Sequence, residues 1–167
     1  GELETVSYFI TLAVAGHDTT SAAMGGGLWA FAHHPDQWAL LRARPDLARG
    51  AANEMIRWIT PIKNFMRTAV ADYDLGGQRI AKGESIAMFY LAANRDEDVF
   101  AEPDAFRIER NPNRQIAFGY GPHMCLGMVL ARMEIASLFT ALTRRFARVE
   151  PVGPLRQSTR VPSSTTK

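Results

Sequence analysis

The sequence predicts a mainly α-helical protein that also contains small β-sheets. Three observations support this fold class. Apolar side chains recur at helical spacing over residues 3–33, a second helical pattern follows Cys125, and β-branched and aromatic residues separated by turn signals fill residues 65–91. The length of 167 residues and the hydrophobic fraction of 47% are ordinary for a single globular domain.

Clear boundary signals separate the helices of the first third. The first pattern, residues 3–33, is interrupted by "GHDTT" and "GGG", and "HHPDQ" then supplies a stop and a new start at Pro35. We expect two further helices, over residues 35–44 and 47–58. The second ends before Pro61, because proline cannot continue a helix and biases the preceding residue away from helical angles.

The middle of the chain has the composition of strands and ordered loops. Within residues 65–91, "LGG" and "AKGE" predict two hairpin turns in a small sheet. Residues 94–113 are rich in Pro, Asn and Asp and show no period, yet they contain Phe100, Phe106 and Ile108, which favour burial. We therefore expect an ordered meander rather than a linker.

The last predicted helix is long and amphipathic. Its apolar and charged side chains recur at intervals of three or four after Cys125. The apolar face comprises Val129, Met133, Ala136, Phe139, Leu142 and Phe146, and the charged face comprises Arg132, Glu134 and Arg144. Residues 151–167 have few apolar groups, so we expect a frayed tail after a domain that spans residues 1–150.

Charge and cysteine content exclude several classes of protein. The chain has 19 basic and 17 acidic residues, and the basic residues form no long run. We therefore expect no nucleic-acid partner. A single cysteine cannot form an internal disulfide, which favours a cytoplasmic protein. The apolar segment "YFITLAVAG" is about half the ~20 residues of a membrane span, so we expect no membrane segment in this chain. Because the chain begins inside a helical pattern, we expect it to be a C-terminal piece of a longer protein.

The cysteine, Cys125, is set in the glycine-rich frame "FGYGPHMCLG". It directly precedes the predicted last helix, whose first N–H groups lack partners and carry a partial positive charge that favours an anionic sulfur. Gly119, Gly121 and Gly127 let the backbone pass close to a flat object, and Pro122 stiffens the loop. For a bare C-x-G, a buried structural cysteine is the alternative.

This frame is similar to the F-x-x-G-x-[HR]-x-C-x-G signature of the cytochrome P450 family. The matching positions are Phe118, Gly121, His123, Cys125 and Gly127. The resemblance implies haem b as cofactor, with the Cys125 thiolate as the proximal iron ligand, a ligand that favours O–O cleavage. It also implies that Gly119 and the other glycines shape the loop, that Phe118 packs beside the porphyrin, and that His123 pairs with a haem propionate.

A second pattern, "NEMIRW", places Glu54 and Arg57 three residues apart on one helix face. From these residues alone, a solvated surface ion pair is the alternative. In the P450 family, such a glutamate and arginine lock with an arginine of the meander, and "FRIER" offers Arg110 in the corresponding place. The resemblance implies a structural triad that supports the haem pocket.

The third pattern is "AGHDTT", in the middle of the first predicted helix. A buried acid and two hydroxyls in an apolar helix are costly unless paired or functional, and a polar kink satisfied by water or by backbone carbonyls is the alternative. The pattern is similar to the family's [AG]-G-x-[DE]-T-[ST], which locally opens the helix over the haem. The resemblance implies that Gly16 leaves room for dioxygen, Asp18 delivers protons through water, and Thr19 holds the bound oxygen for protonation.

Arg67, in "FMRTA", stands where related sequences carry an arginine that contacts a haem propionate. An exposed strand arginine is the alternative. Residues 62–65 resemble the family's apolar substrate-lining stretch. The resemblance covers residues 3–149 and implies the C-terminal part of the P450 fold, from the oxygen-binding helix through the haem-cysteine loop. The resemblance does not include the first half of the family's chain.

The resemblance implies a bacterial haem-thiolate monooxygenase. Such an enzyme would activate dioxygen and hydroxylate an apolar organic substrate such as a sterol, terpene or alkyl chain, with electrons from a ferredoxin-type donor. A truncated, catalytically incompetent relic that binds haem is the second hypothesis. A peroxide-using haem-thiolate enzyme is a third, although family members that use peroxide directly generally lack an acid–alcohol pair such as Asp18 and Thr19.

Overall fold

The computed structural model describes residues 1–153. The helices are α1 (Glu2–His33), α2 (Pro35–Ala43), η1 (Pro45–Leu47), α3 (Ala48–Ile59), α4 (Tyr90–Ala93), η2 (Gly121–His123) and α5 (Met128–Arg145). The strands are β1 (Asn64–Thr68), β2 (Tyr73–Leu75), β3 (Gln78–Ile80) and β4 (Ser85–Phe89). Most of the expected frayed tail, residues 154–167, lies outside the described residues.

The helix α1 is continuous, as a single helix over residues 3–33 predicts, and it shows no local opening at "AGHDTT" of the kind that the resemblance implies. The hydroxyl of Thr19 donates to the carbonyl of Ala15 at 2.7 Å, which satisfies the polar side chain without opening the helix. Gly26 and Gly27 serve packing instead: a Cβ at Gly26 would lie 2.4 Å from Ile59, and one at Gly27 would lie 2.3 Å from Met55. The glycines let α1 approach α3 closely.

The strands form two separate two-stranded sheets. The first turn is as predicted: Gly76 and Gly77 both have positive φ, and β2 and β3 pair as an antiparallel hairpin. The second prediction is wrong, because β4 pairs with β1 and not with β3. The turn at Ala81–Glu84 sends the chain back to β1, and the amide of Ala69 donates to the carbonyl of Glu84 as the pairing begins.

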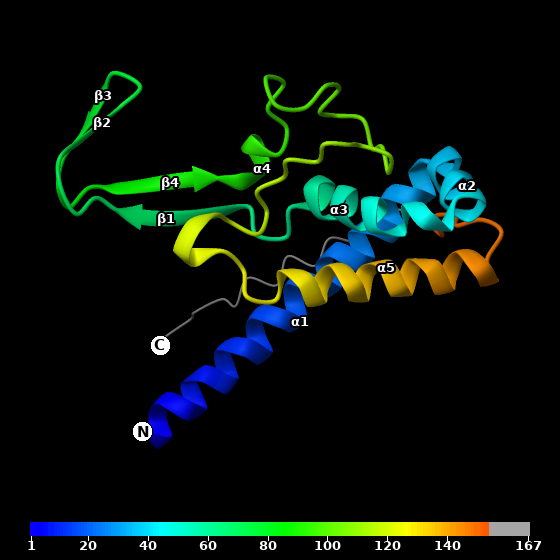
Figure 1. Ribbon diagram of the computed structural model, residues 1–167, viewed down its shortest axis with the longest axis horizontal. Helices are drawn as coiled ribbons and strands as arrows, with labels where there is room; N and C mark the ends of the chain where they lie inside the picture. The colour runs from blue at the N-terminus through cyan, green and yellow to red at the C-terminus, as the bar shows by residue number, and fades with distance from the viewer. Residues whose placement is uncertain (154–167) are drawn as a thin grey trace.

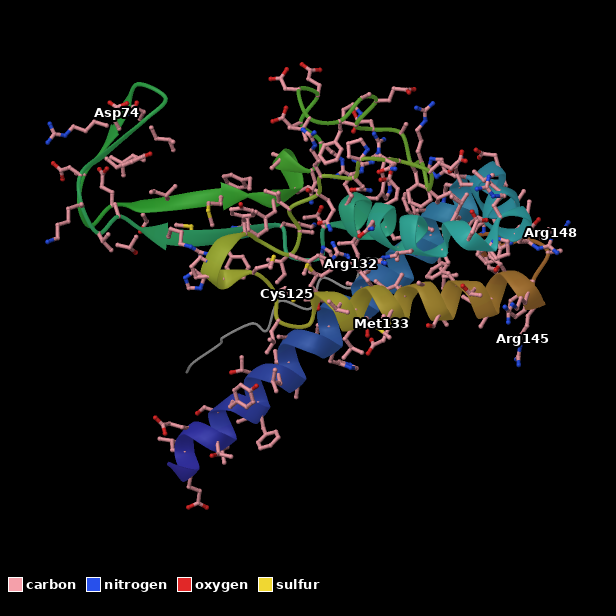
Figure 2. All side chains as sticks on the ribbon, in the orientation of Figure 1. Asp74, Cys125, Arg132, Met133, Arg145 and Arg148 are labelled. Atoms are coloured by element: carbon pink, nitrogen blue, oxygen red, sulfur yellow. The ribbon has the colours of Figure 1, made fainter. Side chains whose placement is uncertain are left out.

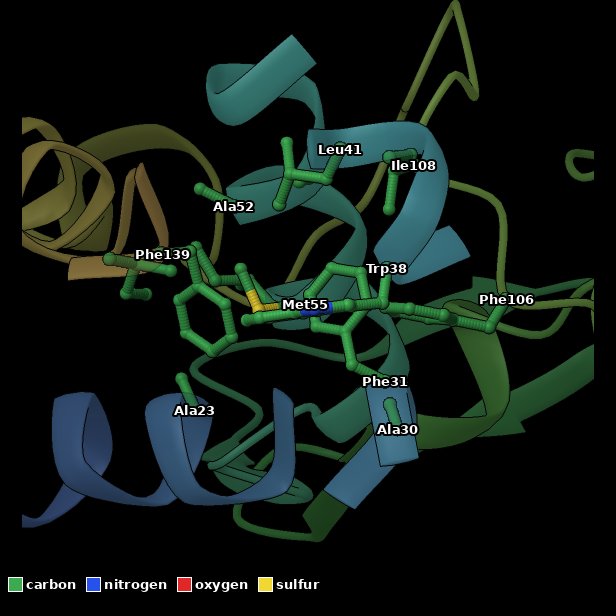
Figure 3. Close-up of a cluster of buried hydrophobic side chains, with 13 residues drawn as sticks. Ala23, Ala30, Phe31, Trp38, Leu41, Ala52, Met55, Phe106, Ile108 and Phe139 are labelled. Atoms are coloured by element: carbon green, nitrogen blue, oxygen red, sulfur yellow. The ribbon is translucent and has the colours of Figure 1, made fainter. Parts of the chain in front are cut away.

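The hydrophobic core lies where the second half of α1 meets α2, α3 and α5 (Figure 3). Phe31 is at its centre, with ring centroids 5.3 Å from Trp38, 5.2 Å from Phe106 and 5.5 Å from Phe139. The meander side chains expected to be buried are buried: Phe100, Phe106 and Ile108 are at most 2% exposed. The meander is therefore ordered against the core.

The buried face of α5 agrees with the predicted one in part: Phe139 is buried and Ala136 and Leu142 pack against the core, but the ends of the predicted face are exposed. Its buried positions are Ile135, Phe139 and Thr143, spaced four residues apart, whereas Val129 and Met133 are exposed. The reason is that α5 crosses the core with only its middle and second half. In Figure 1 the first half of α1 likewise projects away from the other elements. Among residues 1–153, no helix has the length and hydropathy needed to span a membrane.

Candidate functional site

The loop that carries the cysteine is closed by its own backbone. The amide of Cys125 donates to the carbonyl of Phe118 at 2.9 Å, and the amide of Met128, where α5 begins, donates to the carbonyl of Cys125 at 3.4 Å. Gly119 and Gly121 have φ of 73° and 70°, angles that a side chain would strain. The sequence thus builds a tight turn that delivers Cys125 to the start of a helix.

The sulfur of Cys125 is free and exposed. A Cβ added at Gly127 would lie 4.0 Å from this Sγ atom, so the glycine leaves the space beside the sulfur open. On the other side of the loop, the hydroxyl of Tyr90 packs close to Gly119. An accessible thiol at a helix start, inside a rigid loop, can act as a single soft ligand to a metal.

The basic residues expected to contact the cofactor are accessible. His123 is exposed on η2, and Arg67 is half-buried on β1, where its Nη1 donates to the carbonyl of Met66 at 2.9 Å. Within the described part of the chain neither side chain forms an ion pair. Phe118 is half-buried and packs against the core. Both side chains are therefore available to bind an anionic group.

The structure brings Glu54, Arg57 and Arg110 together in the interior. Two nitrogens of Arg57 donate to the two carboxylate oxygens of Glu54, each at 2.8 Å, and Arg110 approaches the same carboxylate at 3.2 Å. The side chains of Glu54 and Arg57 are fully buried, which rules out the surface-pair alternative. Such a pair is stable only when every remaining donor and acceptor is satisfied.

Sequence reasoning missed Asn94, which connects this buried pair to the cysteine loop. The carbonyl of Asn94 accepts from Arg57 at 2.8 Å, and its side chain donates to Thr60 at 2.9 Å. Its Oδ1 atom accepts the amide of Ile116 at 2.8 Å, two residues before Phe118. No sequence signal reveals this role, because the partners lie 22 to 37 residues away.

Asn94 also stabilises the end of α3. Thr60 has a φ of 44°, which is unusual for a β-branched residue. Its hydroxyl donates to the carbonyl of Arg57 at 2.7 Å and accepts the amide of Asn94, and both groups are buried. Asn113, which sequence reasoning also missed, donates to Glu54 at 3.0 Å. The buried network therefore extends from α3 through the meander.

The motif on α1 lies apart from these groups. Gly16 and Asp18 are exposed and Thr19 is half-buried, so the expectation of a buried acid is wrong for the described residues. The neighbouring side chains of α1 project from the body of the molecule, and nothing in residues 1–153 covers them. Within residues 1–153, no hydrogen bond or ion pair joins Asp18 or Thr19 to the cysteine loop.

Comparisons with known proteins agree in sequence and in structure. The profile of the family described as "Cytochrome P450" matches residues 46–161. "Cytochrome P450-terp" of Pseudomonas sp is 45% identical over 150 residues, which cover 90% of this chain and 35% of that protein. "Steroid C26-monooxygenase" of Mycobacterium tuberculosis is 46% identical over 147 residues, which cover 87% and 33%. The chain thus spans about a third of the length of these curated relatives.

A solved structure gives the same result. The crystal structure of CYP108D1 from Novosphingobium aromaticivorans superposes with a TM-score of 0.84 at 46% identity, covering 88% of this chain and 36% of that one. The predicted fold class, mainly α with small β-sheets in the C-terminal part of the P450 fold, is confirmed. The chain belongs to the cytochrome P450 family, whose members bind haem b.

Proposed function

We propose that residues 1–150 are the C-terminal portion of a haem-thiolate domain and that the whole protein is a monooxygenase. The observation that carries the proposal is the exposed Cys125 sulfur, which the closed loop presents at the start of α5. Two relatives are named as a cytochrome P450 and a steroid monooxygenase, and these names support monooxygenation as the reaction class. The whole domain is longer than this chain, in keeping with the share of its relatives that the chain covers.

The residues present fit a haem. Cys125 is exposed, Gly127 leaves space beside its sulfur, and Arg67 and His123 are basic side chains without a carboxylate partner within residues 1–153. Cys125 would bind the iron, and Arg67 and His123 would pair with the propionates. When bound, the haem iron supplies the activation of dioxygen, which thiolate ligation assists. Phe118 would limit the access of water to the sulfur.

Asp18 and Thr19 would hold and move protons during the reaction. The hydroxyl hydrogen of Thr19 is donated to Ala15, so its oxygen remains an acceptor and can fix which way a neighbouring water points its protons. Asp18 is exposed and can exchange protons with solvent. A Cβ added at Gly16 would meet no other segment or side chain within 4 Å, which leaves space beside this pair for a small molecule.

We propose an apolar substrate of the sterol, terpene or alkyl class and a ferredoxin-type electron donor. Support for the substrate comes from the steroid monooxygenase among the relatives and from apolar side chains of β1 and β4 that remain exposed, such as Phe65 and Phe89. The donor is proposed by analogy with bacterial members of the family. A cytoplasmic location follows from the same analogy.

The ligand assignment is tested in the haem-loaded, full-length protein. Reduction under carbon monoxide should give the strongly red-shifted Soret band of a thiolate-ligated haem. Cys125→His should lose this band, because imidazole is a neutral ligand, even if the variant retains haem. A wild-type spectrum in the variant would contradict the assignment. A protein that binds haem and yet shows neither the band nor turnover would favour the relic hypothesis.

A further inference from the structure

Arg132 joins three segments around the cysteine loop. It lies in the first turns of α5, near the same end of the helix as Cys125 (Figure 2). Its Nε atom donates to Oδ1 of Asn53 on α3 at 2.8 Å, and its guanidinium carbon lies 4.9 Å from the ring centroid of Phe118. The sequence pattern puts Arg132 on the charged, solvated face of the helix, but the side chain is half-buried.

The contacts of Arg132 are not those of a charge-neutralising residue. Within residues 1–153 it makes no ion pair, and its two partners are a neutral amide and an aromatic face. Burial lowers the pKa of Arg132, and the charge of Arg49 lowers it further, yet a guanidinium remains protonated at neutral pH. A guanidinium over an aromatic face and a directed N–H bond together fix the orientation of the side chain, which a lysine at this position would not reproduce.

Phe118 is the residue through which Arg132 contacts the cysteine loop. The carbonyl of Phe118 accepts the amide of Cys125 at 2.9 Å, so the backbone at Phe118 sets the backbone at the cysteine. A ring held between the core and the guanidinium cannot rotate without breaking the stack. Asn53 in turn holds the guanidinium in place from α3, next to the buried Glu54.

We infer that Arg132 is a positioning residue for the cysteine loop: anchored by Asn53, it holds Phe118 and thereby the direction of the Cys125 sulfur. The inference rests on the proposed role of Cys125 as the iron ligand. It assigns to Arg132 no contact with substrate or cofactor. Its effect on the haem passes through Phe118 and the hydrogen bond at the Cys125 amide.

The test uses the haem-loaded, full-length protein and two measurements. Hydrogen exchange at the Cys125 amide reports opening of the loop, and the rate at which the red-shifted carbonyl band converts to an unshifted one reports loss of the thiolate ligand. Arg132→Lys and Asn53→Ala should each make exchange about five- to tenfold faster and should speed the conversion, because each releases the stack. Arg145→Lys, exposed on the same helix, is the matched control and should change neither.

A double-mutant cycle assigns the effect to Phe118. In a Phe118→Leu background, Arg132→Lys should add little, because the stack is already gone. Wild-type exchange and band conversion in Arg132→Lys would overturn the inference, and so would exchange that rises equally in all helices, which indicates general destabilisation. If the wild-type protein shows no red-shifted band, the proposed function fails, while amide exchange still decides whether Arg132 holds the loop.

Discussion

At the scale of single residues, the molecule places reactive and structural groups in different surroundings. Glu54 is fully buried and accepts hydrogen bonds from Arg57, Asn113 and the amide of Arg107. Its charge is compensated from every side, so it has no free lone pair for chemistry. Cys125 and Asp18 are exposed. Exposure separates the candidate reactive groups from the groups that support them.

Thr19 provides the sharpest residue-scale prediction for catalysis. In the full-length enzyme, Thr19→Ala should still consume reductant and oxygen but should release more hydrogen peroxide per product, because protons are misdelivered. Asp18→Asn should instead slow turnover, by about 100-fold, since proton transfer is lost. Peroxide, product and reductant are measured in the same assay.

The matched control for this prediction is Thr11→Ala. Thr11 lies on the same helix, is exposed, and its hydroxyl makes the same type of bond, to the carbonyl of Ser7 at 2.8 Å. It should leave coupling unchanged. Normal coupling in Thr19→Ala together with a normal rate in Asp18→Asn would mean that the pair is structural.

At the scale of elements, a run of three glycines has a packing role within α1. Gly27 is buried against Met55 and Phe139, whereas Gly25, two residues earlier, faces open space in this chain. Gly27→Ala should lower the free energy of unfolding by about 1–3 kcal/mol, because the added methyl overpacks the contact with α3. Gly25→Ala should be neutral or raise it by about 0.5–1 kcal/mol, because alanine favours the helix.

Urea unfolding of the two glycine variants, followed by circular dichroism, measures the difference. Because the two substitutions add the same methyl group to the same helix, helix propensity cancels in the comparison. Equal free energies of unfolding for the two variants would contradict the prediction. They would show that α1 and α3 accommodate the added methyl group of Gly27→Ala without loss of stability.

The elements also show what the sequence could and could not predict. The helices α2 and α3 were predicted within one residue at each end, because proline and helical periodicity act locally. The hairpin of β2 and β3 was predicted from its glycines. The pairing of β4 with β1 was not, because a turn signal marks a reversal and leaves the partner open.

The candidate site divides in the same way. The cysteine frame, the Glu54–Arg57 spacing and the acid–alcohol motif are short patterns, and a family resemblance could identify them from the sequence. Asn94 and Arg132 act through partners outside their own elements, 14 to 79 residues away, so no local pattern distinguishes them from surface residues. Contacts of this kind are visible only once the chain is folded.

At the scale of the whole molecule, a large apolar surface is uncovered in this chain. The exposed apolar side chains of the first half of α1 are Leu3, Val6, Tyr8, Phe9, Ile10, Leu12 and Val14. Val129, Leu130 and Met133 of α5 are exposed as well. Surfaces of this size are aggregation liabilities unless another segment or partner covers them.

We therefore expect the isolated 167 residues to bind haem weakly or not at all and to show no hydroxylation, although the cysteine frame and the acid–alcohol motif are both present. The chain is expressed alone, titrated with haemin, and assayed for oxygenation with a ferredoxin system. The full-length protein is the control. Tight stoichiometric binding with a red-shifted carbonyl band, or coupled turnover, would show that these residues suffice.

The contact between Phe31 and Phe139 has a consequence for biosynthesis. The two rings belong to α1 and α5, at opposite ends of the described chain, yet they meet in the centre of one core. The ribosome makes α1 long before α5. The apolar side chains of the earlier helices that contact α5, such as Phe31, therefore stay uncovered until α5 has been synthesised. The cysteine loop directly precedes α5, and the amide of Met128 at the start of this helix donates to the carbonyl of Cys125. We therefore expect the proposed haem to bind stably only after α5 has been synthesised.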